Sequence, residues 1–299
     1  MHRAPRLLLA FLLGMGVITV PPAVRLMASS PAPAQAEQKA ILKPVAAKAP
    51  DTPFNNYELE VEQQLLVFAN QSRHQAGAPP LSVDSGLSQA ARTHAQSMLD
   101  ARQLSHQFEG EPALPQRLAA TTDAQLDQEA ENVALDYDAQ HGHEHLMSSP
   151  PHRANLLNPA YNVIGLGVVR SGDRLYIVED FGHALPNYTI PDLKDRIARS
   201  VSGLRTQSGH PALSRRDLLI ADDAACSMAR ADKLGTSPVH KLAERFTVLT
   251  YTSLHPEALP NGAIHALTSQ NLSSFSIGAC YSRTATYPTG VYWIVLTLD

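Results

Sequence analysis

Several features that usually mark an enzyme are missing from this sequence of 299 residues. It has only two cysteines, and neither lies in the first half of the chain. It contains no Gly-x-Ser-x-Gly segment, which would place a serine nucleophile on a sharp turn, and no glycine-rich phosphate loop. The sequence therefore offers no evident nucleophile for acyl transfer and no evident site for a nucleotide phosphate.

Long hydrophobic runs are also scarce, and the one at the amino terminus predicts an export signal. Arg3 and Arg6 precede an apolar run from Leu7 to Val20, and Ala34-Gln35-Ala36 offers a small-residue cleavage site. The run is shorter than the roughly 20 residues of a membrane-spanning helix. We therefore predict a signal peptide at residues 1–36, with an uncleaved anchor as the alternative, and a flexible linker rich in Ala and Pro at 37–53.

An excess of positive charge is absent as well. The formal net charge is -4, and loss of residues 1–36 leaves 21 basic and 28 acidic residues, a net charge of -7. A surface of this sign does not favour nucleic acid or an anionic membrane face. The expected partners are a small-molecule or lipid ligand or an envelope protein, and the expected location is extracellular or periplasmic.

The two cysteines, Cys226 and Cys280, have two interpretations. An exported chain meets an oxidising compartment, so a disulfide between them is one of these. Two free buried thiols are the other, because the sequence does not give their separation in space.

Hydrophobic spacing predicts helices at the start of the folded part. Apolar residues recur at spacings of four, four and three, at Tyr57, Val61, Leu65 and Phe68. A second helix is predicted after a turn at 82–85, from the apolar positions Leu81, Leu87, Ala91, Ala95 and Met98. Residues 106–129 are predicted to be irregular, and 138–148 to be helical.

The most specific stretch runs from Ser148 to Val168. Pro150 and Pro151 should stop the preceding helix and leave His152 on a turn, because proline lacks a backbone donor and restricts the residue before it. An irregular segment with Asn155 follows, and then an apolar strand from Val163 in which glycines leave room for a close approach.

This order of helix, proline stop, His-Arg-x-Asn and glycine-spaced strand resembles the CAP superfamily of SCP-like secreted proteins, in its bacterial form. The segment around Asn70 and Arg73 is similar to the family's opening helix. The resemblance implies an α+β fold, a CAP-type α-β-α sandwich, at residues 54–186.

The resemblance also implies an open cleft lined by three side chains, His106, Glu131 and His152, with Asn132, Arg153 and Asn155 as supporting residues. Two imidazoles and a carboxylate can hold Zn²⁺ or another divalent metal, with His106 and His152 as ligands, or move a proton. The alternative is that these side chains only bridge loops by hydrogen bonds.

Two further observations bear on this cleft. Some family members have a second acid there, but the positions where we would expect it hold Ser148 and Ser149. The histidines at 141, 143 and 145 cannot share one helical face, so we interpret them as a solvated helix start and not as a metal cluster.

The second half repeats elements of the first. Helical spacing returns at Leu193, Ile197, Val201 and Leu204, Ile164-Gly165 returns as Ile277-Gly278, and Tyr176-Ile177-Val178 returns as Trp293-Ile294-Val295. Such order predicts a duplicated unit, with a smaller, diverged CAP-like α/β domain at 187–299. This copy lacks counterparts of Glu131 and His152, so we expect it to keep the scaffold and lose the site.

We therefore expect a secreted, non-enzymatic protein that binds a ligand in a His/Glu cleft. A metal-dependent hydrolase acting on envelope or extracellular polymers is one alternative, with Glu131 as the base. A structural envelope or adhesion module is the other. Fold resemblance by itself does not choose among them.

Overall fold

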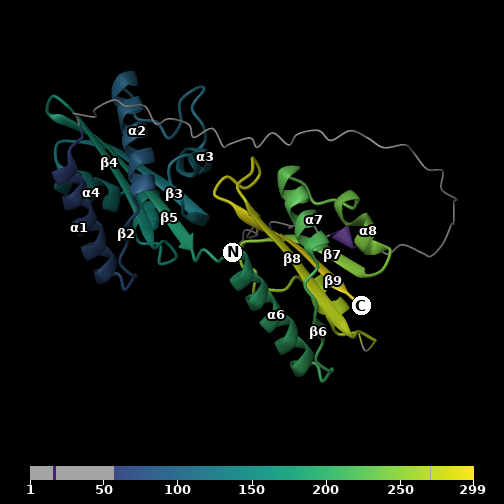
Figure 1. Ribbon diagram of the computed structural model, residues 1–299. Helices are drawn as coiled ribbons and strands as arrows, with labels where there is room; N and C mark the ends of the chain where they lie inside the picture. Colours follow the sequence, from purple (N-terminus) through teal and green to yellow (C-terminus); the bar gives the residue numbers. More distant parts are fainter. Residues whose placement is uncertain (1–15, 18–56, 270) are drawn as a thin grey trace, which may run out of the picture.

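The computed structural model describes Gly16–Val17 and residues 57–269 and 271–299, which form two lobes, each built around its own β-sheet (Figure 1). The predicted signal peptide and linker lie outside the described residues, apart from Gly16–Val17. None of the helices in the described ranges has the length and apolar character needed to cross a membrane.

The first lobe is a four-stranded sheet in the order β2-β4-β5-β3, with β2 parallel to β4 and the other neighbours antiparallel. Its elements are α1 (Leu59–Gln75), β2 (Ser82–Val83), α2 (Ser85–Ala101), α3 (Leu114–Ala119), β3 (Gln125–Asp136), α4 (Ala139–Ser148), α5 (Pro150–Leu156), β4 (Val163–Ser171) and β5 (Arg174–Leu185).

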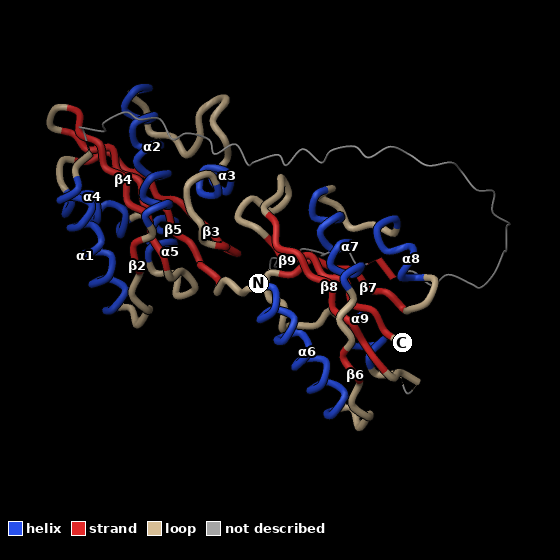
Figure 2. The backbone as a smooth tube through the Cα atoms, in the orientation of Figure 1, coloured by secondary structure: helices blue, strands red, loops and turns tan. Residues whose placement is uncertain are grey.

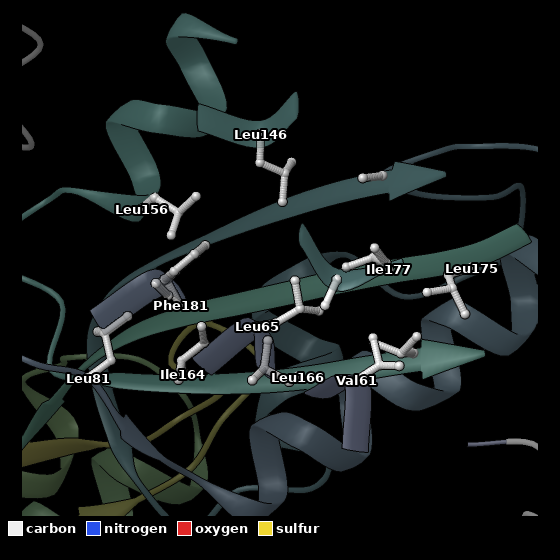
Figure 3. Close-up of a cluster of buried hydrophobic side chains, with 14 of the residues drawn as sticks. Val61, Leu65, Leu81, Leu146, Leu156, Ile164, Leu166, Leu175, Ile177 and Phe181 are labelled. Atoms are coloured by element: carbon white, nitrogen blue, oxygen red, sulfur yellow. The ribbon is translucent and has the colours of Figure 1, made fainter. Parts of the chain in front are cut away.

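Helices cover both faces of this sheet. On one face, α1, α4 and α5 bury apolar side chains against β4 and β5, and Figure 3 shows Leu65, Leu146 and Leu156 among them. On the other face, Ala91, Ala95 and Met98 of α2 pack on the sheet. The predicted α+β class and α-β-α sandwich are confirmed.

Helix α2 lies unusually close to β4, and two glycines permit this. A Cβ atom on Gly165 would come within 2.1 Å of the backbone of Leu87, and one on Gly167 within 2.2 Å of that of Ala91. The close approach that the glycine spacing predicted is therefore made by a helix of the same lobe.

Three local predictions were wrong. Ser82–Val83 forms strand β2 and not a turn, and Leu81 precedes it instead of lying in the second helix. The segment predicted to be irregular contains α3 and the start of β3. Pro150 and Pro151 end α4 as predicted but also begin α5, so His152 and Asn155 are helical. Proline suits the first helical turn, where its missing N–H would have no intrahelical acceptor.

The second lobe has a five-stranded sheet in the order β1-β7-β9-β8-β6. Figure 2 shows its strands β6, β7, β8 and β9 in red. Its elements are β1 (Gly16–Val17), α6 (Ile190–Gln207), β6 (Ser214–Arg215), α7 (Leu219–Arg230), the 3-10 helix η1 (Ser237–Val239), α8 (His240–Ala243), β7 (Thr247–Ser253), α9 (Asn261–Leu267), β8 (Ser274–Ser282) and β9 (Val291–Leu298). Apart from β1, the strand order repeats that of the first lobe.

The strand registers place the two lobes in correspondence. Gly167 lies opposite Val178 and packs on Ala91, whereas Gly278 lies opposite Val295 and packs on Ala221. Gly278 thus corresponds to Gly167, so the predicted alignment with Gly165 was wrong by two residues. The duplication itself stays a prediction.

A disulfide joins Cys226 of α7 to Cys280 of β8, with their Cα atoms 5.1 Å apart. The prediction of a bridge is confirmed, and it fastens the covering helix of the second lobe to its sheet. A disulfide limits the freedom of the unfolded chain and so stabilises the fold.

The lobes contact each other through the loop between β8 and β9. Arg283 donates hydrogen bonds to the carbonyl oxygens of Ala119 and Thr122, at 2.9 and 2.7 Å. The hydroxyl of Thr289 donates to the carbonyl of Leu126 at 3.0 Å. The loop of the second lobe therefore supports the segment between α3 and β3.

Candidate functional site

The candidate site lies at strand β3, an edge strand of the first sheet. Glu131 and Asn132 are neighbours on β3, so their side chains point to opposite faces of the sheet. His106 comes from the loop between α2 and α3, and His152 from the first turn of α5. The edge strand is thus where segments from both helical layers meet.

The three predicted cleft residues come together. His106 Nδ1 lies 2.9 Å from Glu131 Oε1, and the ring centroids of His106 and His152 are 6.5 Å apart. The side chain of His106 is 58% exposed, whereas that of Glu131 is only 4% exposed. Since a carboxylate can only accept, His106 Nδ1 donates and its Nε2 is left for other partners.

The carboxylate of Glu131 is fully engaged by protein groups. Arg117 Nη2 donates to Glu131 Oε2 at 2.5 Å, and His94 Nε2 lies 3.8 Å from the same oxygen. Together with His106, these contacts use both oxygens. Glu131 therefore acts as an anchor for the cationic and imidazole groups around it.

A second acid is present, but it lies in the segment 106–129 and not near Ser148 and Ser149, where it was expected. Glu111 Oε1 is 2.7 Å from His94 Nδ1 and accepts from Arg117 Nη1 at 3.1 Å. Burial raises the pKa of Glu111, but bonds from the Phe108 amide, His94 and Arg117 outweigh it, so the pKa is lowered overall. Its place after the predicted His106 was the only signal that could have indicated it.

Asp180 lies beside Glu131, on the neighbouring strand β5, and was not predicted as a site residue. It is the register partner of Glu131 and is 1% exposed. Burial raises the pKa of Asp180 well above its ordinary value, and the negative charge of Glu131 adds to this effect. The neutral form of Asp180 is favoured, because a second buried negative charge here would be repelled by Glu131.

On the opposite face, Asn132 and Asn155 position the helix that carries His152. Asn132 Nδ2 donates to the carbonyl of His152 and to Glu179 Oε2, both at 3.1 Å, and Asn155 Nδ2 donates to Asn132 Oδ1 at 3.0 Å. Glu179 is completely buried, and this burial raises its pKa to about 7. Two of the predicted supporting residues therefore hold the backbone of the site.

The remaining two predicted residues differ in their surroundings. Burial, and then the nearby charge of His106, lower the pKa of His152, so the neutral imidazole is favoured. Arg153 is exposed, and its side chain has no ion pair within the part of the chain that the structure describes. It does not join the network around Glu131.

A catalytic metal centre does not fit these residues. Catalytic zinc sites use three protein ligands, but the ring centroids of the two imidazoles are 6.5 Å apart, and Glu131 already pairs with His106 and Arg117. Among the described residues, no group of three or more His, Cys, Asp or Glu side chains is placed to hold a metal ion.

The histidines of α4 are also separate from one another. His141 pairs with Asp138, His145 pairs with Asp136, and His143 Nε2 lies 2.8 Å from the Ser72 hydroxyl. The prediction that they do not form a metal cluster agrees with this geometry. The prediction of a solvated helix start was wrong for His143, which is buried against α1.

Comparisons with known proteins agree with this fold. Residues 68–181 match the model of the cysteine-rich secretory protein family, CAP. The protein YkwD of Bacillus subtilis (strain 168) is 30% identical over 120 residues, which are 37% of this chain and 43% of that protein. The chain thus spans less than half the length of this curated relative.

Two solved structures are similar to part of the chain. An extracellular protein containing an SCP domain from Bacillus anthracis is 25% identical, with 42% of this chain and 41% of that chain covered and a TM-score of 0.37. An outer surface protein from Borrelia burgdorferi is 19% identical, with 42% of this chain and 94% of that chain covered and a TM-score of 0.40.

The first lobe is thus an α-β-α sandwich with a polar His/Glu site over its edge strand. Residues 68–181 form a CAP domain, and the predicted membership of the CAP superfamily, in its bacterial form, is confirmed.

Proposed function

We propose that this CAP-domain protein is an exported binding protein, and that its first lobe holds a ligand between His106 and His152 without changing it chemically. The observation that carries the proposal is the burial and pairing of Glu131. Each of its oxygens already contacts His106 or Arg117 and its side chain is only 4% exposed, so little of the carboxylate is open to a substrate or a water.

The two imidazoles provide the binding groups. Each neutral imidazole has one donor and one acceptor nitrogen, and the Nδ1 of His106 is already used. The lowered pKa of His152 favours its neutral form. The pair therefore suits a ligand with a hydroxyl or another hydrogen-bonding group, such as a polar lipid, or a short segment of an envelope protein.

Native mass spectrometry tests this proposal on protein purified from the medium or envelope of its own host. We expect a bound mass that the double variant His106→Ala/His152→Ala loses. The variant His265→Ala removes an exposed histidine of the second lobe and should keep the bound mass. Circular dichroism should show that all three proteins are folded.

Two results would contradict the proposal. One is a double variant that keeps the bound mass. The other is stoichiometric Zn²⁺ uptake by the native protein in isothermal titration calorimetry that the double variant loses, which would favour the metal-dependent hydrolase. Absence of zinc uptake in both proteins is the expected outcome.

A further inference from the structure

The second lobe contains a cavity of about 280 Å³ that lies far along the chain from the His/Glu cleft. It opens between the start of α7, helix α8 and the ends of strands β8 and β9. Its floor includes Ser276 and Thr297, which are register partners on the face of the sheet that α7 covers.

The cavity exists because α7 begins later than its counterpart α2. Ser276 precedes Gly278 by two residues on β8, as Gly165 precedes Gly167 on β4. Their partners, Thr297 and Asp180, follow Val295 and Val178 by two residues in the same way, so Ser276 corresponds to Gly165. In the first lobe the backbone of Leu87 fills the space above Gly165, one helical turn before Ala91. One turn before Ala221, the chain has not yet become helical, and a cavity lined in part by Ser276 lies there.

The floor of the cavity contains an unsatisfied polar group. Ser276 is 1% exposed, and its hydroxyl has no hydrogen-bond partner among the residues that the structure describes. A buried hydroxyl without a partner costs about 1 to 3 kcal/mol, so a ligand atom that bonds to it would recover free energy.

Positive charge surrounds the cavity. Arg216, Lys241 and Arg245 line it, and no ion pair of theirs occurs among the described residues. Asp299 contributes the one carboxyl side chain of the lining, and that side chain accepts a hydrogen bond from Ser274 at 3.4 Å. An anion placed here would thus meet three cationic side chains.

The amino terminus of α7 also lies at the cavity, and Asp222 in its first turn is paired with Lys194. Leu218 is its N-cap residue and provides no side-chain bond to the helix. By contrast, Asp84 caps α2 and accepts from the amide of Leu87 at 2.8 Å. Uncapped amides at a helix start favour an anion, and here they occur beside an unpartnered hydroxyl.

The remaining walls are apolar. Leu218, Ile220 and Phe246 line the cavity, and Ile220 is 43% exposed. The adjacent Leu219 is 83% exposed, so apolar surface continues outside the opening. A small inorganic anion would leave this surface in water, whereas an attached hydrocarbon group would cover it.

We infer that this cavity is a second binding site, for an amphiphilic organic anion in which a carboxylate or phosphate head group carries an apolar chain. The head group lies by Ser276 and the cations, and the chain lies along Ile220 toward Leu219. This site is independent of the ligand proposed for the His/Glu cleft.

Isothermal titration calorimetry with octyl phosphate, below its micelle concentration, tests this inference on the full chain. We expect octyl phosphate to bind at least 10-fold more tightly than inorganic phosphate or octanol, since only the first has both parts. Octanoate in a parallel titration distinguishes the head groups: tighter binding of octanoate assigns a carboxylate, and weaker binding assigns a phosphate.

The variants locate the site. Arg216→Gln/Lys241→Gln should weaken octyl phosphate at least 10-fold, whereas Arg230→Gln/Lys233→Gln, with the same charge loss elsewhere in the lobe, should change it less than 2-fold. His106→Ala/His152→Ala should leave it unchanged. Equal affinity for octyl phosphate and inorganic phosphate, or an equal loss in both charge variants, would overturn the inference. The single variant Lys241→Gln gives the same comparison if the double variant is unfolded.

Discussion

The two lobes share a scaffold and differ at the start of the helix that covers the sheet. In the first lobe α2 runs from Ser85 to Ala101, begins at an acidic cap and presses on Gly165. In the second lobe α7 runs from Leu219 to Arg230, and the buried Ser276 lines a cavity beside its start. The comparison shows that one lost helical turn can turn a packed layer into a cavity while the sheet order is kept.

What the lobes share is best seen at two buried arginines. Arg73 donates hydrogen bonds to the carbonyl oxygens of Pro79, Leu156, Asn158 and Tyr161. Arg205 donates to those of Pro211, Leu267 and Ser269, and its Nη2 has no partner among the described residues. Each arginine therefore joins its first helix to distant loops of the same lobe.

The largest expected effect comes from replacing these buried arginines. Arg73→Met keeps an apolar stem but leaves buried carbonyl groups without a donor, so the free energy of unfolding should fall by about 4 kcal/mol. Arg205→Met removes fewer bonds and should cost about 3 kcal/mol. Urea unfolding followed by circular dichroism measures both. The exposed Arg199→Met is the control, and a loss of the same size there would contradict the explanation.

The next effect concerns the pair Gly165 and Ser276. Gly165→Ser would push a side chain into the backbone of Leu87 and should destabilise the protein by about 3 kcal/mol. Ser276→Gly removes an unpartnered hydroxyl next to open space and should change stability by less than about 1 kcal/mol. Thermal unfolding compares them, and equal losses would contradict the difference in packing between the two positions.

The smallest expected effect is a pH dependence of the free energy of unfolding that arises from Glu179 in the first lobe. Glu179 has a pKa of about 7 in the folded protein, above its ordinary value of 4.5, because it is buried. Between these pH values the folded state keeps a proton that the unfolded state has lost. The free energy of unfolding should therefore fall by about 2 to 3 kcal/mol as the pH rises from about 4.5 to about 7, and then stay level.

Glu179→Gln should remove the contribution of Glu179 to this decline, since an amide does not titrate in this range, while the raised pKa of Asp180 leaves a decline of the same sign. Leu296 occupies the corresponding position of β9, so the second lobe has no such group there. Urea unfolding at pH 5, 6, 7 and 8 provides the measurement. An unchanged decline in the variant would assign it to another group.

The sequence allowed prediction of those features that depend on local order. Helical spacing located α1, and the two prolines located the end of α4. The family resemblance brought His106, Glu131 and His152 into one site, although they lie on three separate elements. Each of these predictions rests on a spacing or a motif within a short stretch of sequence.

Other features depend on contacts between distant segments. Ser82–Val83 has the composition of a turn and becomes a strand only because β4 pairs with it. Glu111 and Asp180 reach Glu131 through His94, Arg117 and the register of β3 with β5. No spacing rule links these residues, so the second acid could not be located from the sequence.

The hydrogen bonds of Arg283 matter for any study of the first lobe alone. A chain shortened after Pro186 would leave the carbonyls of Ala119 and Thr122 without this donor, at the carboxyl end of α3, the helix that carries Arg117. Arg117 would then hold Glu131 from a less firmly supported helix. Affinities measured on such a fragment would therefore describe a looser His/Glu site than the one in the whole protein.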